Sequence, residues 1–217
     1  MKQPRARSYE TWMMQLFLGT AAIVMLYPIV MMVLSGFKTN AEIFGTPFAL
    51  PKSFNLDNFK VIWTQTDVPR YFLNSVIVTI LSVIVLLVTG TMAAYAIARY
   101  RFRGSIFVSL FFLSGLMLPL RLAIIPLFIQ LKFLGLVDSL LGLICIYTAM
   151  SLPATVFILT GFLRSLPTEL EDSARMDGAS EFRIMVQIMV PLITPALVIA
   201  GIYNAVPIWN DFFFPLI

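Results

Sequence analysis

The residues of this chain whose types and spacing could do chemistry are few, and most lie in one polar segment, 165–183. The chain contains no histidine and so lacks the most common general base and metal ligand. It also lacks a Gly-x-x-x-x-Gly-Lys-Ser/Thr phosphate loop, a Gly-x-Ser-x-Gly nucleophile motif and paired carboxylates within its apolar runs. Its one cysteine, Cys145, lies in an apolar stretch and is expected to pack as a small residue. The sequence predicts no catalytic centre, metal site or cofactor.

The same polar segment carries ordered signals for two short helices. Thr168 and Glu171 have the spacing of a capping box, in which the hydroxyl accepts from a backbone N–H three residues on and the carboxylate returns to the cap. Gly178 can take the left-handed conformation that ends a helix. Ser180 can cap a second helix that carries Phe182. The pattern predicts a compact, exposed pair of helices that meet at Gly178.

The elements that position this segment must lie in a membrane. Hydrophobic residues make up 59% of the 217 residues and charged residues only 12%, whereas soluble domains average about half apolar and about a quarter charged. The formal net charge of +4 comes from basic residues that lie mostly at the ends of apolar runs. This distribution indicates orientation in a bilayer. We therefore expect contact with membrane lipid and no nucleic-acid partner.

Five apolar runs are long enough, or nearly so, to cross the hydrocarbon core, which takes about 20 residues as a helix. The third run reaches that length only if Arg121 is tolerated near its end. The predicted spans are 12–37, 71–98, 104–129, 139–163 and 184–214. The sequence predicts an all-α fold, a polytopic transmembrane helix bundle, that forms a single domain over 1–217.

Prolines within these runs predict kinks. They are Pro119, Pro126, Pro153, Pro195 and Pro207. An odd number of crossings places Ile217 outside the cell, in the middle of apolar sequence. We therefore expect a last external loop, a sixth span and a cytoplasmic tail to be missing from this chain.

Orientation follows from the basic residues that flank the spans. If the N-terminus is cytoplasmic, the inner segments hold nine lysines and arginines and the outer segments hold five, which is the cytoplasmic excess typical of membrane proteins. The loop 164–183 then lies in the cytoplasm and the segment 38–70 lies outside. In that outer segment Asn55, Asp57 and Asn58 are placed to cap a short helix.

A spaced motif runs from the cytoplasmic loop into the fifth apolar run. Residues 172–174 read Asp-Ser-Ala, Gly178 follows after three residues, and 188–191 read Ile-Met-Val-Pro after nine more. This spacing resembles Glu-Ala-Ala, three residues, Gly, nine residues, Ile, one residue, Leu-Pro in the permease subunits of bacterial and archaeal ATP-binding-cassette (ABC) importers. Asp, Ser and Val here stand for Glu, Ala and Leu, and keep charge, small size and apolarity.

Further segments resemble the carbohydrate-importer branch of this family. They are Arg-Tyr-Arg-Phe-Arg-Gly (99–104), Ile-Pro-Leu-Phe (125–128), Leu-Gly-Leu (134–136), the stretch 166–178, and Trp-Asn-Asp (209–211) with Pro215. Within the branch, the chain is similar to the shorter six-span partner of a permease pair, as in maltose and glycerol-phosphate importers. The likeness runs over nearly the whole chain.

The resemblance implies that the short helix of the loop seats in a cleft of a separate ATPase, whose closure moves the spans from inward-facing to outward-facing. The implied coupling residues are Glu171, Asp172, Ser173, Ala174, Arg175, Met176, Asp177, Gly178, Ala179, Phe182 and Arg183. Met176 and Phe182 would be apolar anchors among polar contacts. ATP hydrolysis would belong to the partner, so the chain itself would not be an enzyme.

The implied partners are an ATPase dimer, a second permease subunit and an extracytoplasmic solute-binding protein. The implied location is the cell membrane of a bacterium or archaeon. Glycerol phosphate or a polyol are alternative solutes to a sugar or oligosaccharide.

Candidates for contact with a solute lie late in the fifth run and near the end of the third. Asn204, Trp209, Asn210 and Asp211 offer hydrogen bonds and stacking to a sugar, although tryptophan is also an ordinary anchor at a membrane interface. Arg121 is a candidate because a charge at membrane depth is costly and often functional. Snorkelling to the outer interface is the alternative for Arg121.

Other interpretations of the whole chain compete with the importer permease. A secondary transporter is less favoured because, apart from Arg121 and Asp211 near the end of the fifth span, the spans lack charged groups for ion coupling. A polytopic membrane enzyme would have little chemistry to work with. The loop itself could be an ordinary capped connector, since capping boxes and Asp-Gly turns are common.

Overall fold

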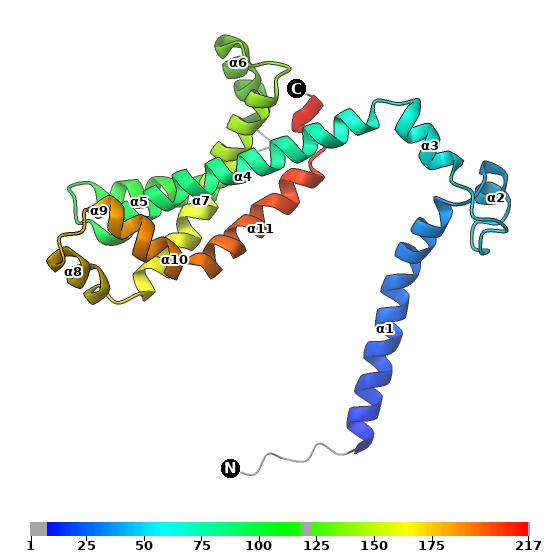
Figure 1. The fold of residues 1–217 in the computed structure, drawn as a ribbon, viewed down its shortest axis with the longest axis horizontal. Coiled ribbons are helices and arrows are strands. Elements are labelled where there is room, and N and C mark those ends of the chain that lie inside the picture. Colours follow the sequence, from blue (N-terminus) through cyan, green and yellow to red (C-terminus); the bar gives the residue numbers. More distant parts are fainter. Residues whose placement is uncertain (1–7, 119–122, 217) are drawn as a thin grey trace. The chain divides into compact units, whose positions relative to one another are not determined.

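The computed structural model describes residues 8–118 and 123–216 (Figure 1). The described residues form helices joined by turns and loops, with no strand, so the predicted all-α fold is confirmed. The chain divides into two compact units between Tyr71 and Phe72. The division falls in the first turn of the long helix α4 (Val68–Arg99).

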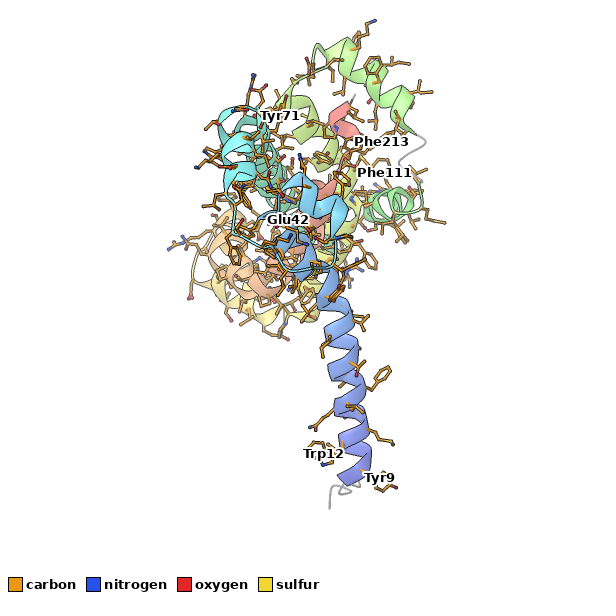
Figure 2. All side chains as sticks on the ribbon, turned by 90° about the vertical axis from the view of Figure 1, so that its right-hand side faces the viewer. Tyr9, Trp12, Glu42, Tyr71, Phe111 and Phe213 are labelled. Atoms are coloured by element: carbon orange, nitrogen blue, oxygen red, sulfur yellow. The ribbon has the colours of Figure 1, made fainter. Side chains whose placement is uncertain are left out.

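The first unit holds a long apolar helix and a small folded segment. α1 (Ser8–Ser35) is followed by α2 (Asn40–Gly45) and α3 (Asp57–Thr64). The stretch Thr11–Ser35 of α1 is long and apolar enough to cross a membrane, and its side chains, such as that of Trp12, are exposed along the helix (Figure 2). Because exposed apolar surface is unfavourable in water, we expect lipid or another helix to surround α1.

The predicted short helix in the segment 38–70 is confirmed as α3. At its start, Asn55 Oδ1 accepts a hydrogen bond from the backbone N–H of Asp57 at 2.7 Å. The amide of Asn58 donates to the carbonyl of Lys38 at 2.9 Å, so this side chain ties the helix to the preceding loop.

The second unit contains the elements from α4 onward. After α4 they are α5 (Ser105–Gly115), α6 (Ile124–Leu134), α7 (Leu140–Ser165), α8 (Glu169–Met176), α9 (Glu181–Ile184), the π-helical segment η2 (Met185–Met189), α10 (Val190–Leu192), α11 (Thr194–Asn210) and the 3-10 turn η3 (Phe214–Leu216). Figure 1 shows α8 and α9 together at one end of this unit and α6 at the other.

Among the described residues, three helices are long and apolar enough to cross a membrane, and they correspond to the first, second and fourth predicted spans. They are Thr11–Ser35 within α1, α4 and α7. The third and fifth predicted spans, 104–129 and 184–214, are not single straight helices among the described residues. The count of five crossings stays a prediction.

The third predicted span is divided into two shorter helices. α5 ends at Gly115 and α6 begins at Ile124, so 104–129 is not the continuous helix that was expected. α5 thus ends before the predicted kink at Pro119 is reached. Pro119 and Arg121 both lie outside the described residues.

The fifth predicted span is sharply bent. Its two parts, Glu181–Leu192 and Thr194–Asn210, meet at 76° on either side of Ile193. Pro195 lies in the first turn of α11 and cannot supply the backbone donor that would continue the preceding helix. The kink predicted at Pro195 is therefore confirmed.

The larger of the two buried apolar clusters joins α4, α7 and the chain from α8 to α11. Its buried members are Ala94, Tyr95, Ile97, Val156, Leu159, Leu163, Ala174, Ile184, Met185, Met189, Ile193, Ala196 and Ala200. α8 contributes only Ala174 to this cluster, so apolar packing alone attaches α8 weakly.

Close packing of three helices depends on Gly90 in α4. A Cβ atom at Gly90 would lie 2.7 Å from Cγ2 of Thr155 in α7. Thr155 is itself held, because its Oγ1 accepts a hydrogen bond from Nδ2 of Asn204 in α11 at 3.0 Å. Only glycine therefore fits at this contact without displacing a neighbour.

Gly90→Ala is expected to lower the free energy of unfolding by about 1–3 kcal/mol, the usual range for an overpacked core. Gly161→Ala in α7 is the control, because a Cβ there meets nothing within 4 Å and alanine favours a helix. Thermal unfolding of the detergent-solubilised protein compares them. If Gly90→Ala and Gly161→Ala have the same melting temperature, the described contact is absent.

Candidate functional site

The loop 164–183 folds as the two short helices α8 and α9. Between them Gly178 takes a left-handed backbone conformation, with φ of 79°. The side chain of Ser180 then accepts a hydrogen bond from the backbone N–H of Arg183 and begins α9, which carries Phe182. The predicted pair of helices and their junction at Gly178 are confirmed.

The predicted capping box at the start of α8 is wrong. Thr168 has helical backbone angles, φ −74° and ψ −21°, and its side chain makes no capping hydrogen bond. Glu171 is buried and turns toward Arg99 at the end of α4. A buried arginine requires a counter-charge, and that requirement outweighs the modest gain from a cap.

A buried ion pair joins α8 to α4. Nε of Arg99 lies 2.5 Å from Oε1 of Glu171, and the two side chains are 5% and 2% exposed. The approach is not along a hydrogen-bond direction, so this contact is electrostatic. Arg99 also donates from Nη2 to the Leu166 carbonyl at 3.2 Å, and the Tyr95 hydroxyl donates to Glu171 Oε2 at 3.3 Å.

A second set of polar contacts holds α9. The Tyr100 hydroxyl donates to Glu181 Oε2 at 2.7 Å, and the Tyr95 hydroxyl lies 3.4 Å from the same oxygen. Arg175 donates from Nε to Glu181 Oε1 at 2.7 Å and from Nη2 to Glu181 Oε2 at 3.2 Å. Arg175 also pairs with Asp172 at 2.8 Å. The two short helices are therefore bound to each other and to the end of α4.

These contacts fix the charge states of two groups outside the predicted spans. Hydrogen bonds from Arg175 lower the pKa of Glu181 from 4.5 to about 2. Burial raises the pKa of Tyr100, and its hydrogen bond to Glu181 raises it further. At neutral pH Glu181 is therefore a carboxylate, and Tyr100 keeps the proton that it donates.

The outer face of the loop presents two large apolar side chains. Met176 at the end of α8 is 88% exposed, and Phe182 in α9 is 69% exposed. Of the other predicted coupling residues, Asp172, Ser173, Arg175, Asp177, Gly178 and Arg183 are exposed, Ala179 is half-buried, and Glu171 and Ala174 are buried. Exposed apolar side chains on an ordered polar loop mark an interaction surface.

Comparison with known proteins decides the family. Residues 87–217, more than half of the chain, match the family described as binding-protein-dependent transport system inner membrane component. The chain belongs to this permease family. It is 36% identical over 219 residues to the probable ABC transporter permease protein YurM of Bacillus subtilis, covering 99% of this chain and 72% of that protein.

Two further relatives are named for the uptake of sugars. The diacetylchitobiose uptake system permease protein NgcG of Streptomyces coelicolor is 38% identical over 195 residues, and the match covers 90% of this chain but only 65% of the length of NgcG. The multiple sugar-binding transport system permease protein MsmG of Streptococcus mutans is 34% identical over 203 residues, covering 92% of this chain and 73% of that protein.

The fold of the family is shared with a solved structure. A chain in the crystal structure of a bacterial ABC transporter involved in the import of the acidic polysaccharide alginate matches with a TM-score of 0.86 and 23% identity. The match covers 98% of this chain and 76% of that chain. It supports the permease fold.

The predicted solute contacts in this permease are only partly open. Asn204 is buried, and its amide donates to Thr155 Oγ1 at 3.0 Å and to the Ala200 carbonyl at 2.7 Å. Asp211 is also engaged, because its Oδ2 accepts from the Tyr147 hydroxyl at 2.7 Å. Both side chains are used for contacts within the second unit.

Trp209 and Asn210 are the exposed members of that predicted set. The Trp209 ring stands edge-on to Phe72 of α4, with ring centres 5.6 Å apart, and remains partly exposed. The Asn210 amide donates to the Val206 carbonyl at 2.8 Å, which leaves its oxygen open. The structure brings these two residues to the end of α11 and turns Asn204 away from them.

Sequence reasoning missed the residues that anchor the loop. The sequence places Arg99 among the inner basic residues and in the segment 99–104, but assigns Arg99, Tyr95, Tyr100 and Glu181 no role in holding the loop. A signal was present, because the end of a predicted span combines tyrosine and arginine while α8 begins with three acids. Such clusters of opposite charge on one side of a membrane predict pairing.

Glu181→Gln is expected to lower the melting temperature of the solubilised protein by a few degrees at pH 7 and pH 5. A carboxylate with a lowered pKa contributes in full above pH 4.5, and its contribution declines as the pH falls toward 2. The difference from the parent should therefore shrink at pH 3. Glu169→Gln, at an exposed acid of α8, is the control and should change little at any pH.

Proposed function

We propose that this chain is a transmembrane permease subunit of an ATP-driven, binding-protein-dependent importer, and that the loop 164–183 couples it to a separate ATPase. The observation that carries the proposal is the structure of the loop. Its two ordered helices are held to α4 by a buried ion pair, and they expose Met176 and Phe182. Family membership supports the same function.

The proposed docking surface excludes the buried side of the loop. Met176 and Phe182 supply its apolar anchors, and Asp177 and Arg183 supply exposed charges beside them. The Glu171 carboxylate is paired with Arg99 and is buried, so it does not belong to the docking surface. Partly exposed Arg175 mainly holds the loop together, so changes there would disturb the loop as well as its partner.

The proposed assembly contains an ATPase dimer, a second permease subunit and an extracytoplasmic solute-binding protein, with the N-terminus of this chain in the cytoplasm. The apolar, exposed α1 supports contact with lipid or another subunit. The basic residues at the end of α4 and at the end of α7 support a cytoplasmic loop.

The proposed solute is a sugar or oligosaccharide. Relatives named for diacetylchitobiose, multiple sugars and arabinooligosaccharides support this class. Trp209 and Asn210 are the proposed pathway contacts, because an exposed ring and amide oxygen can stack on and hydrogen-bond to a sugar. Glycerol phosphate or a polyol is the alternative solute class.

Replacing both anchors, as Met176→Ala with Phe182→Ala, is expected to reduce the ATPase subunit that copurifies with the tagged permease by about 10-fold or more. The few anchor side chains that dominate an interface contribute about 2 kcal/mol or more each, and about 1.4 kcal/mol corresponds to 10-fold. The measurement is the ratio of ATPase to permease after mild detergent extraction.

Phe133→Ala is the matched control for this experiment, because Phe133 is 89% exposed on α6, at the other end of the second unit (Figure 1). It should leave the ratio unchanged. Retention of the ATPase at the parent level by the double variant would contradict the proposed docking surface. Transport by proteoliposomes that needs an ion gradient but no ATP would instead support a secondary transporter.

A further inference from the structure

We infer that the buried pair of Arg99 and Glu171 carries the movement of the coupling loop into α4, which makes Arg99 a positioning residue for transport. This inference rests on the proposed function. It adds the internal connection that lies behind the docking surface.

The pair is the most protected attachment of α8. Its two side chains are 5% and 2% exposed, whereas Arg175 is 37% exposed and contacts only other loop residues among the charged groups. Buried charges are screened far less than exposed ones, so their attraction persists when the surroundings shift. Apart from Glu171, only Ala174 of α8 is buried.

One guanidinium joins three elements. Arg99 is the last residue of α4, its Nε faces Glu171 of α8, and its Nη2 donates to the carbonyl of Leu166, the residue that ends α7. The bond from Nη2 to Leu166 is directional, and the attraction between Nε and the Glu171 carboxylate is electrostatic. A displacement of α8 therefore pulls on α4 and on the end of α7 together.

The tyrosines extend the connection to α9. The Tyr95 hydroxyl, one turn before Arg99, lies 3.3 Å from Glu171 Oε2 and 3.4 Å from Glu181 Oε2. Tyr100 follows Arg99 directly and donates to Glu181. Side chains at the end of α4 thus hold both short helices. Because packed helices move as rigid units, force applied at Met176 and Phe182 reaches α4 through these side chains.

The test uses the assembled importer, isolated through a tag on this permease and placed in proteoliposomes. All variants carry Cys145→Ser, since that thiol is exposed, and Leu73→Cys, which puts a reporter at an exposed position near the start of α4. A membrane-impermeant maleimide then labels the reporter without nucleotide and with ATP and vanadate.

In the parent, nucleotide is expected to change the labelling rate by about 5-fold or more, as for a typical coupling between sites. Arg99→Ala and Glu171→Ala should keep the ATPase but reduce the change to less than about 2-fold, and the double variant should be no worse than either. Arg103→Ala is the control, because Arg103 is an exposed arginine between α4 and α5. It should respond like the parent.

If a single variant assembles poorly because it leaves one buried charge unpaired, Arg99→Gln with Glu171→Gln decides the matter, since it leaves no charge. A full response to nucleotide in this neutral pair overturns the inference and makes the contact only structural. Loss of the ATPase from it also overturns the inference, by assigning the pair to docking. A parent that never retains an ATPase overturns the proposed function itself.

Discussion

The need to pair two buried charges organises the cytoplasmic end of this protein. Arg99 and Glu171 both lie out of solvent, and a buried arginine left without its carboxylate would cost about 3–5 kcal/mol. Once Glu171 faces Arg99, the helical spacing puts Ala174 and Arg175 on the same side of α8. Met176 must then point outward. The exposure of Met176 is thus set by the burial of a charge five residues earlier.

The same constraint depends on how closely the long helices pack. α4 approaches α7 at Gly90, where a methyl group would meet Thr155, and the two helices share the buried cluster that includes Ala94 and Leu159. This close approach supports the placement of Arg99 beside the end of α7, where it meets the Leu166 carbonyl. Packing within the apolar region and charge pairing at its edge therefore support one another.

Sequence predicted the local features of the loop and missed its tertiary ones. Gly178 and Ser180 act through residues next to them, so their roles follow from type and spacing. Glu171 had two plausible partners, Thr168 nearby and an arginine on another helix. Spacing along the chain can detect only the pairing with Thr168. The pairing with Arg99 forms because both charges are buried. Hydropathy likewise found the apolar runs but not the end of α5 at Gly115 or the 76° size of the bend at Ile193, because composition does not report direction.

Polar residues in apolar helices show the same limit. The type of Asn204 suits either a solute contact or a contact between helices, since both use the same hydrogen bonds. An asparagine amide has two hydrogens to donate, and here both are used, by Thr155 Oγ1 and by the Ala200 carbonyl. A sugar hydroxyl could accept a hydrogen bond from this amide only by displacing one of them from a buried position. Asn204 therefore links α11 to α7, whereas Trp209 and Asn210 keep exposed groups at the end of the same helix.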